Sequence, residues 1–175
     1  MDNVAGIISK HNKQVLNPPI ESDTPSCNCR NKDTCPLNGR CRESAIIYKA
    51  DVKSEEQEDF YYGLCETEFK TRYNNHTCSF RNRTIKSSKN PKKKNTGCRL
   101  KNHIWKLKDA MKNFSISWSI EAKSRPYVCG SKNCALCAKE KLCIALAPRK
   151  GLLNKRTEII SSCPHRWKFL LKNVT

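Results

Sequence analysis

Three segments of the chain have the pattern of hydrophobic and polar residues that is typical of β-strands. Residues 45–52 and 59–65 are rich in β-branched and aromatic side chains, and the acidic connection between them has the length of a hairpin loop. Residues 114–120 alternate strictly between apolar and polar side chains, as a strand with one buried face does. The pattern therefore predicts a small, mainly antiparallel sheet of three strands.

Other segments carry apolar residues at helical spacing, which places them on one face of a helix. Pro148 and Gly151 are expected to end the third of these helices. Helices packed on a small sheet make an α/β fold of the α+β type. The predicted helices are 67–80, 100–111, 133–146 and 152–161, and a short apolar segment, 167–171, closes the chain.

The chain divides into a lead-in, a cysteine-rich segment and one folded domain. Residues 1–26 begin as a helix and then contain Pro18, Pro19 and Pro25, so they predict a lead-in that ends as an extended linker. Residues 27–44 are dense in cysteine and turn residues. Residues 45–171 hold the predicted strands and helices, a length that suits one domain.

The charge of the chain points to a polyphosphate partner. The sequence contains 34 Lys and Arg against 16 Asp and Glu, a formal net charge of +18, and nucleic acid is the commonest partner of such a surplus. The longest apolar run is far below the roughly 18 residues of a membrane span, and the N-terminal apolar stretch is too short for a secretory signal. We therefore expect an intracellular, nuclear protein that binds DNA and no membrane.

Between residues 81 and 108 the chain carries many lysines and arginines and no acidic residue. Its first two-thirds predict a basic loop, in which lysines would meet phosphates as point charges. A solvated loop or a nuclear-import patch would have the same composition. The candidate DNA contacts are Lys92, Lys93, Lys94, Arg99 and Lys101.

Twelve cysteines are many for a chain in a reducing compartment, where metal ligation explains them more easily than disulfides do. Cys134 and Cys137 form a C-x2-C pair, and Cys163 and His165 offer a thiolate and an imidazole further along. Four such ligands suit tetrahedral, structural zinc. The alternative is a redox pair at a helix N-terminus, where a thiol pKa falls.

A second set of four thiolates lies in the cysteine-rich segment. It predicts a second structural zinc site, although C-x-C is a tighter spacing than the common C-x2-C. Mixed sites, in which His103 or His76 replaces one thiolate, are the alternative. The four cysteines are Cys27, Cys29, Cys35 and Cys41.

Several motifs resemble the GIY-YIG endonuclease family in order and approximate distance. The first is Ile46-Ile-Tyr48, with isoleucine in place of the family glycine, and the second is Tyr61-Tyr-Gly63, with Tyr62 in place of the middle isoleucine. The later matching positions are Phe69-x-x-Arg72-x-x-x-His76, Glu140 and Asn154.

Longer strings over residues 26–171 are similar to the endonuclease region that follows the reverse transcriptase in Penelope-like retroelements. In that comparison the lead-in matches a linker from the polymerase, and the basic stretch is longer than usual. The strings are CNCRNKDTCPLNGRC, YNNHTCSFRN, HIWKLKD, GSKNCALCAKEK and LLNKRTE.

The resemblance implies Mg²⁺-dependent (or Mn²⁺-dependent) nicking of one DNA strand, with one group for each chemical task. Tyr48 would accept the proton of the attacking water, helped by Tyr61 and His76. Arg72 would hold a phosphate oxygen, Glu140 would ligate the cation, and Asn154 would shape the phosphate or metal site. A reverse transcriptase, in the same chain or a separate one, is an implied partner. Cutting both strands would need a second chain, as in a homodimer, or a second cutting event.

Two other classes of function remain open from the sequence. A catalytically inactive, zinc-stabilised nucleic-acid-binding module would explain the charge and the metal ligands. A thiol redox protein would explain only the C-x2-C pair.

Overall fold

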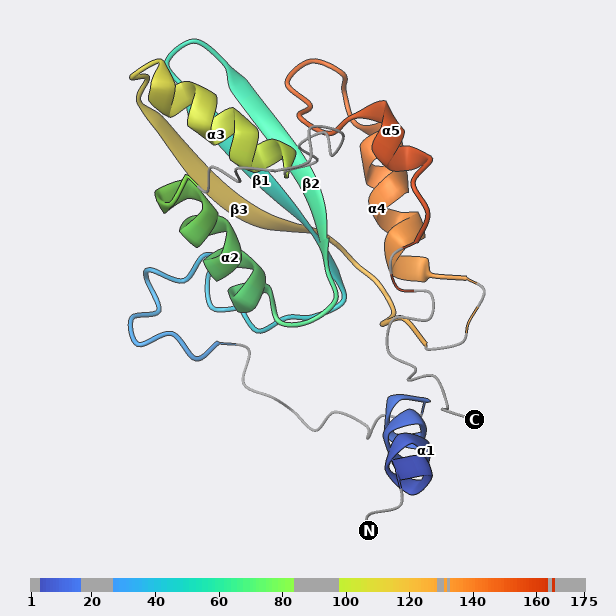
Figure 1. The fold of residues 1–175 in the computed structure, drawn as a ribbon. Coiled ribbons are helices and arrows are strands. Elements are labelled where there is room, and N and C mark those ends of the chain that lie inside the picture. Colours follow the sequence, from blue (N-terminus) through green and yellow to red (C-terminus); the bar gives the residue numbers. More distant parts are fainter. Residues whose placement is uncertain are drawn as a thin grey trace, which may run out of the picture.

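The computed structural model describes residues 4–16, 27–83, 98–128, 131, 133–163 and 165. It contains a small antiparallel sheet with helices on it, as the sequence predicts for an α+β fold (Figure 1). The elements in chain order are α1 (Val4–Leu16), β1 (Ile46–Ser54), β2 (Glu58–Cys65), α2 (Phe69–Arg81), α3 (Arg99–Asp109), β3 (Phe114–Lys123), α4 (Ala135–Leu146) and α5 (Arg156–Ile159).

The sheet has the strand order β2-β1-β3, with both pairings antiparallel. The register of the first hairpin sets Tyr48 opposite Gly63 and Ala50 opposite Tyr61. Between β1 and β3 the register shifts at Ile47 and Tyr48, which is a β-bulge. Bulges turn side chains and are frequent near functional sites, and this one lies directly at Tyr48.

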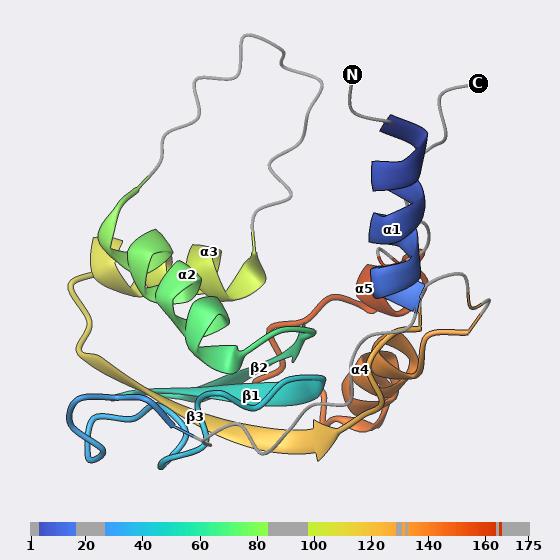
Figure 2. The ribbon, with the colours of Figure 1, turned by 90° about the horizontal axis from the view of Figure 1, so that it is seen from below.

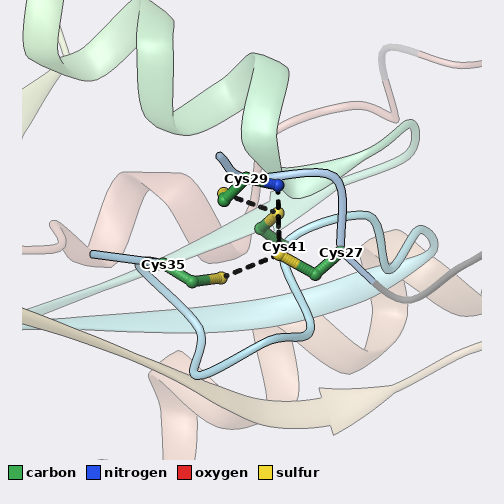
Figure 3. Close-up of side chains that lie close together, drawn as sticks. All are labelled: Cys27, Cys29, Cys35 and Cys41. Atoms are coloured by element: carbon green, nitrogen blue, oxygen red, sulfur yellow. Dashed lines mark hydrogen bonds between the residues drawn. The ribbon is translucent and has the colours of Figure 1, made fainter. Parts of the chain in front are cut away.

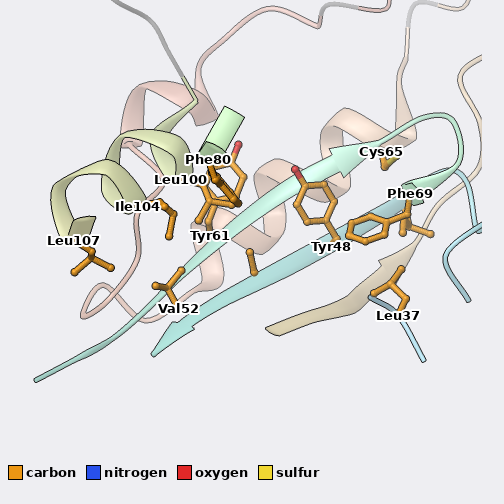
Figure 4. Packing of buried hydrophobic residues seen from close by; sticks show 12 residues of the cluster. Leu37, Tyr48, Val52, Tyr61, Cys65, Phe69, Phe80, Leu100, Ile104 and Leu107 are labelled. Carbon is orange, nitrogen blue, oxygen red and sulfur yellow. The ribbon is translucent and has the colours of Figure 1, made fainter. Parts of the chain in front are cut away.

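The two faces of the sheet have separate hydrophobic cores. Figure 2 shows α2 and α3 together on one face, where Tyr48, Tyr61, Phe69 and Ile104 belong to the larger core. Figure 4 shows the side chains of that core, with Tyr48 and Tyr61 rising from neighbouring strands. On the other face α4 packs against Ile47 and a smaller set of side chains. The central strand β1 is therefore covered on both sides.

The last predicted helix is shorter than expected. We expected a helix over 152–161, but only Arg156–Ile159 is helical. The residues before it pair in extended form with the open edge of β2: Phe60 N donates to Gly151 O at 2.7 Å, and Leu153 N donates to Phe60 O at 2.9 Å. These bonds satisfy the N–H and C=O groups of Phe60 at the open edge of β2. The expected segment 167–171 lies outside the described residues.

Candidate functional site

Tyr48 is the centre of a buried polar cluster. Its side chain is fully buried, at 0% exposure, between β1 and α2. Gly63 leaves room for the phenol, because a Cβ at that position would come 2.5 Å from Tyr48 Cζ. The close approach explains physically why glycine follows the two tyrosines of β2. It also fixes the hydroxyl group against the start of α2.

Two side chains of α2 contact the Tyr48 hydroxyl group. Arg72 Nε donates to Tyr48 Oη at 3.2 Å, and the hydroxyl lies 2.8 Å from His76 Nε2. Arg72 and His76 are four residues apart and so share one helix face, as the sequence indicated. Since the guanidinium only donates, the phenol oxygen accepts from Arg72, and the phenol proton can point to His76 Nε2 in the tautomer whose proton is on Nδ1.

Tyr48 and His76 have strongly shifted pKa values. Burial raises the pKa of Tyr48 well above its usual range, and the positive charge of Arg72 offsets this only in part. Burial, together with Arg72, lowers the pKa of His76 to about 4. At neutral pH Tyr48 is therefore a neutral phenol and His76 a neutral imidazole, with one ring nitrogen unprotonated.

Aromatic side chains enclose this cluster. Trp118 of β3 lies 5.4 Å from His76 and 5.8 Å from Tyr48 between ring centroids. Tyr61 is 6.5 Å from Tyr48, and burial raises the pKa of Tyr61 well above its usual range. The sequence analysis named Tyr61 but missed Trp118, although the alternation of β3 already put Trp118 on the core side.

Glu140 reaches the same sheet from α4. Its Oε1 accepts a hydrogen bond from Leu64 N at 3.0 Å, on the open edge of β2. Burial raises the pKa of Glu140 to about 7; Glu158 adds to the rise and Arg72 opposes it. A carboxyl group with this pKa is readily deprotonated by a bound cation, and carboxylate oxygens are the usual ligands of Mg²⁺.

Asn154 is buried, and its amide group is engaged within the protein. Its Oδ1 accepts from Tyr62 N at 2.8 Å, and its Nδ2 donates to Tyr62 O at 2.9 Å and to Glu158 Oε2 at 2.8 Å. The amide thus pairs with the edge of β2 as a neighbouring strand would. A role at a phosphate or metal stays a prediction.

The C-terminal metal ligands come together as predicted. The ligand atoms of Cys134, Cys137, Cys163 and His165 all lie within 4.8 Å of one another. His165 Nδ1 is 3.2 Å from Cys137 Sγ and 3.5 Å from Cys134 Sγ. The C-x2-C pair lies at the start of α4, one turn before Glu140.

The N-terminal cysteines form a second cluster, which Figure 3 shows in close-up. Cys27 Sγ lies 3.7 Å from both Cys35 Sγ and Cys41 Sγ. Although burial opposes it, the N–H groups of Leu37 and Gly39 lower the pKa of Cys35 to about 6. Gly39 adopts a positive φ of 88°, which favours glycine and lets its N–H point back at the sulfur.

The distances in both clusters fit a metal better than disulfides. A disulfide joins its sulfur atoms at about 2.05 Å. Zn–S bonds of about 2.3 Å at tetrahedral angles separate two sulfurs by about 3.8 Å, and sulfur from nitrogen by about 3.6 Å. The observed Sγ–Sγ distances of 3.4 to 3.7 Å are close to the first value, and the three Sγ–Nδ1 distances at His165 run from 3.2 to 3.6 Å, at or somewhat below the second. Both clusters could hold a metal.

The mixed metal sites that we considered are not formed. His76 binds Tyr48, and His103 Nε2 lies 3.2 Å from Asp59 Oδ2, away from both clusters. The four cysteines of residues 27–44 already make a complete set, so no histidine is needed.

Of the candidate DNA contacts, Arg99 begins α3 and Lys101 follows in its first turn, both half-buried. Lys92, Lys93 and Lys94 lie outside the described residues.

The sequence analysis missed two acidic residues near these sites. Glu158 bonds Asn154 and raises the pKa of Glu140. Glu66 Oε2 lies 3.4 Å from His165 Nε2. Neither is marked by a motif in the sequence, because the effect of Glu158 on Glu140 and the contact of Glu66 with His165 join residues far apart along the chain.

Comparisons of the chain with protein-family models, with curated proteins and with solved structures found no match. Among the described helices, none is long and apolar enough to cross a membrane.

We expect two zinc ions per chain in protein purified under reducing conditions without chelator. Each cluster offers four ligands of the type and spacing that tetrahedral zinc requires. Elemental analysis of the dialysed protein measures the ratio. A value below one zinc per chain, with no loss of structure in chelator, would contradict both sites.

Proposed function

We propose that this protein is a GIY-YIG-like endonuclease, derived from or part of the integration machinery of a retroelement, which nicks one DNA strand by phosphodiester hydrolysis. The observation that carries the proposal is the contact of the Tyr48 hydroxyl group with both Arg72 and His76. A structural tyrosine needs one partner for its hydroxyl group. A phenol between a cation and a neutral imidazole has the partners that proton transfer near a phosphate requires.

The raised pKa of Tyr48 defines how it would work as a base. A neutral phenol cannot take a proton from water unless it gives up its own, and His76 Nε2 is 2.8 Å away to receive it. Tyr48 would thus pass a proton from water to His76. The negative charge of a bound phosphate would offset Arg72 and strengthen both bases.

Glu140 would hold the divalent cation, Mg²⁺ or Mn²⁺. One oxygen is fixed by Leu64 N, and the other has no hydrogen bond or ion pair among the described residues. When bound, such a cation supplies charge stabilisation at the scissile phosphate and activates water.

DNA is the proposed substrate, and the nucleus the proposed location. The formal net charge of +18 is far larger than a neutral substrate would need. A reverse transcriptase in the same chain or in another one would be the natural partner of such a nuclease. One set of catalytic groups cuts one strand, so a double-strand break would need a second copy of the chain or a second cutting event.

A plasmid assay tests the proposal directly. Supercoiled DNA should become the relaxed circle with Mg²⁺, and should stay supercoiled with EDTA or with Glu140→Ala. Linear DNA as the first product would contradict single-strand nicking. Binding without any cleavage would favour the inactive, zinc-stabilised binding module, which the complete burial of Tyr48 also fits.

The thiol redox alternative is less favoured. A redox-active thiol at a helix N-terminus needs a lowered pKa. Burial instead raises the pKa of both Cys134 and Cys137.

Replacing Lys92, Lys93 and Lys94 by Ala should weaken DNA binding equally for all sequences. The logarithm of the affinity falls with the logarithm of the salt concentration, and each phosphate contact that is lost should make this negative slope less steep by about 0.9. Binding titrations at several salt concentrations measure this slope. Alanine at Lys53 and Lys112, which pair with Glu58 and Glu56, is the control. An unchanged slope would show that these three lysines do not contact DNA.

A further inference from the structure

The start of α2 is held by the N-terminal cysteine cluster. The first N–H groups of a helix need partners from outside the helix, and the N-cap residue Glu68 offers no side-chain bond here. Instead Phe69 N donates to Glu43 O at 3.0 Å, and Lys70 N donates to Cys41 O at 2.7 Å. A predicted metal ligand, Cys41, and the residue two positions after it thus cap the helix that carries Arg72 and His76.

The C-terminal cluster reaches the same turn through Glu66. His165 directs Nδ1 toward the thiols, and its other nitrogen, Nε2, lies 3.4 Å from Glu66 Oε2. When Nδ1 binds a metal, Nε2 must carry the N–H of the neutral imidazole. The backbone of Glu66 is fixed as well, since Ala45 N donates to Glu66 O at 3.2 Å. Stacking of Tyr127 on the imidazole, with ring centroids 5.7 Å apart, holds the ring in this orientation.

We propose that Glu66 is a positioning residue, which couples the C-terminal metal cluster to the start of α2 and thereby sets where Arg72 and His76 stand. A carboxylate on the outer nitrogen of a metal-bound histidine fixes the ring and raises its basicity. Here that carboxylate lies only three residues before Phe69, the first residue of α2. Metal binding at residues distant from Tyr48 would therefore change the positions of Arg72 and His76 beside the Tyr48 hydroxyl group.

Two variants break this contact in different ways. Glu66→Gln removes the carboxylate charge but keeps the size of the side chain. His165→Cys keeps four metal ligands and removes the imidazole. Glu58→Gln is the matched control, because Glu58 is an exposed carboxylate at the opposite end of β2 from Glu66, and among the described residues its ion pair is with Lys53.

Competition with a chromophoric chelator measures the metal contact without DNA. Loss of a partner behind a metal-bound histidine typically weakens metal affinity about 10–100-fold. We expect that loss for Glu66→Gln, no change for Glu58→Gln, and full zinc content for His165→Cys. Affinity equal to the wild type in Glu66→Gln would overturn the proposal.

The coupling to α2 is measured at Trp118, which packs on Phe69, Tyr73 and His76 of that helix. With 5-fluorotryptophan, the Trp118 resonance should shift in zinc-loaded Glu66→Gln and His165→Cys, and not in Glu58→Gln. The double variant should shift no further than either single variant. Independent, additive shifts, or none, would overturn the proposal.

The nicking readout rests on the proposed function. In the zinc-loaded variants the maximal rate should fall while KM for DNA stays unchanged, since α2 positions reacting groups more than it binds the substrate. If the wild type does not nick DNA at all, the proposed function fails. The chelator and Trp118 measurements then still decide the role of Glu66.

Discussion

Replacing Tyr48 by Phe should slow plasmid nicking about 10²–10³-fold, the usual loss when one electrostatic or proton-transfer contact is removed from a transition state. The ring and its packing remain, so the protein should still fold and bind DNA. What disappears is the oxygen that Arg72 and His76 both contact. The measurement is the rate of relaxed-circle formation at saturating Mg²⁺.

Tyr62→Phe is the matched control for this variant. Tyr62 is also a buried strand tyrosine, at 7% exposure, but it faces the smaller core on the other side of the sheet. Removal of the Tyr62 hydroxyl group should leave the rate of plasmid nicking unchanged. If Tyr48→Phe nicks DNA as fast as the wild type while Glu140→Ala is inactive, Tyr48 is not the base, and His76 becomes the first candidate to activate water.

The sheet could be predicted because its strands carry local signals. Strict alternation over 114–120 requires one buried face, and the observed β3 alternates between half-buried and exposed residues along its whole length. The order of the strands and the bulge at Tyr48 could not be read in the same way. They depend on pairings between residues far apart in sequence.

The segment 151–154 shows where local patterns fail. Its apolar residues fit a helical spacing, yet the open edge of β2 offers unpaired N–H and C=O groups that must be satisfied. Leu152 therefore bridges to Phe60 in extended form, and Gly151, with a positive φ of 81°, turns the chain into place. Pairing with the sheet overrides the local preference.

The candidate site was predictable wherever ligand chemistry fixes spacing. Thiolates in short spacings predicted both metal clusters, and the i and i+4 spacing predicted that Arg72 and His76 share a face. The contact of Glu66 with His165 joins residues almost a hundred positions apart. Such a contact has no periodic signature, so only the folded chain reveals it.

Replacing Cys137 by Ser should remove one zinc per chain and unfold more than the ligand cluster. Zinc binding free energy is folding free energy, about 10–16 kcal/mol for structural zinc in small peptides at neutral pH. The chain has only a modest apolar content of 37% to compensate for that loss. Cys137 is itself buried at the start of α4, next to Leu136 of the smaller core. We expect a markedly lower melting temperature and loss of helical signal in circular dichroism.

Cys78→Ser is the control, because Cys78 is an exposed free thiol on α2 that belongs to neither cluster. It should keep both zinc ions and the melting temperature of the wild type.

Acidification should have the same effect as Cys137→Ser. Protons compete with zinc for thiolates, so the stability of the protein falls as the pH is lowered. Nicking should be lost together with the zinc. Glu140 lies on α4 about one turn after Cys137, and its carboxylate bonds the edge of β2. Without the zinc the start of α4 is no longer fixed, so the helix should not hold Glu140 in this position. A Cys137→Ser protein that retains two zinc ions and melts like the wild type would show that these four residues are not a metal site.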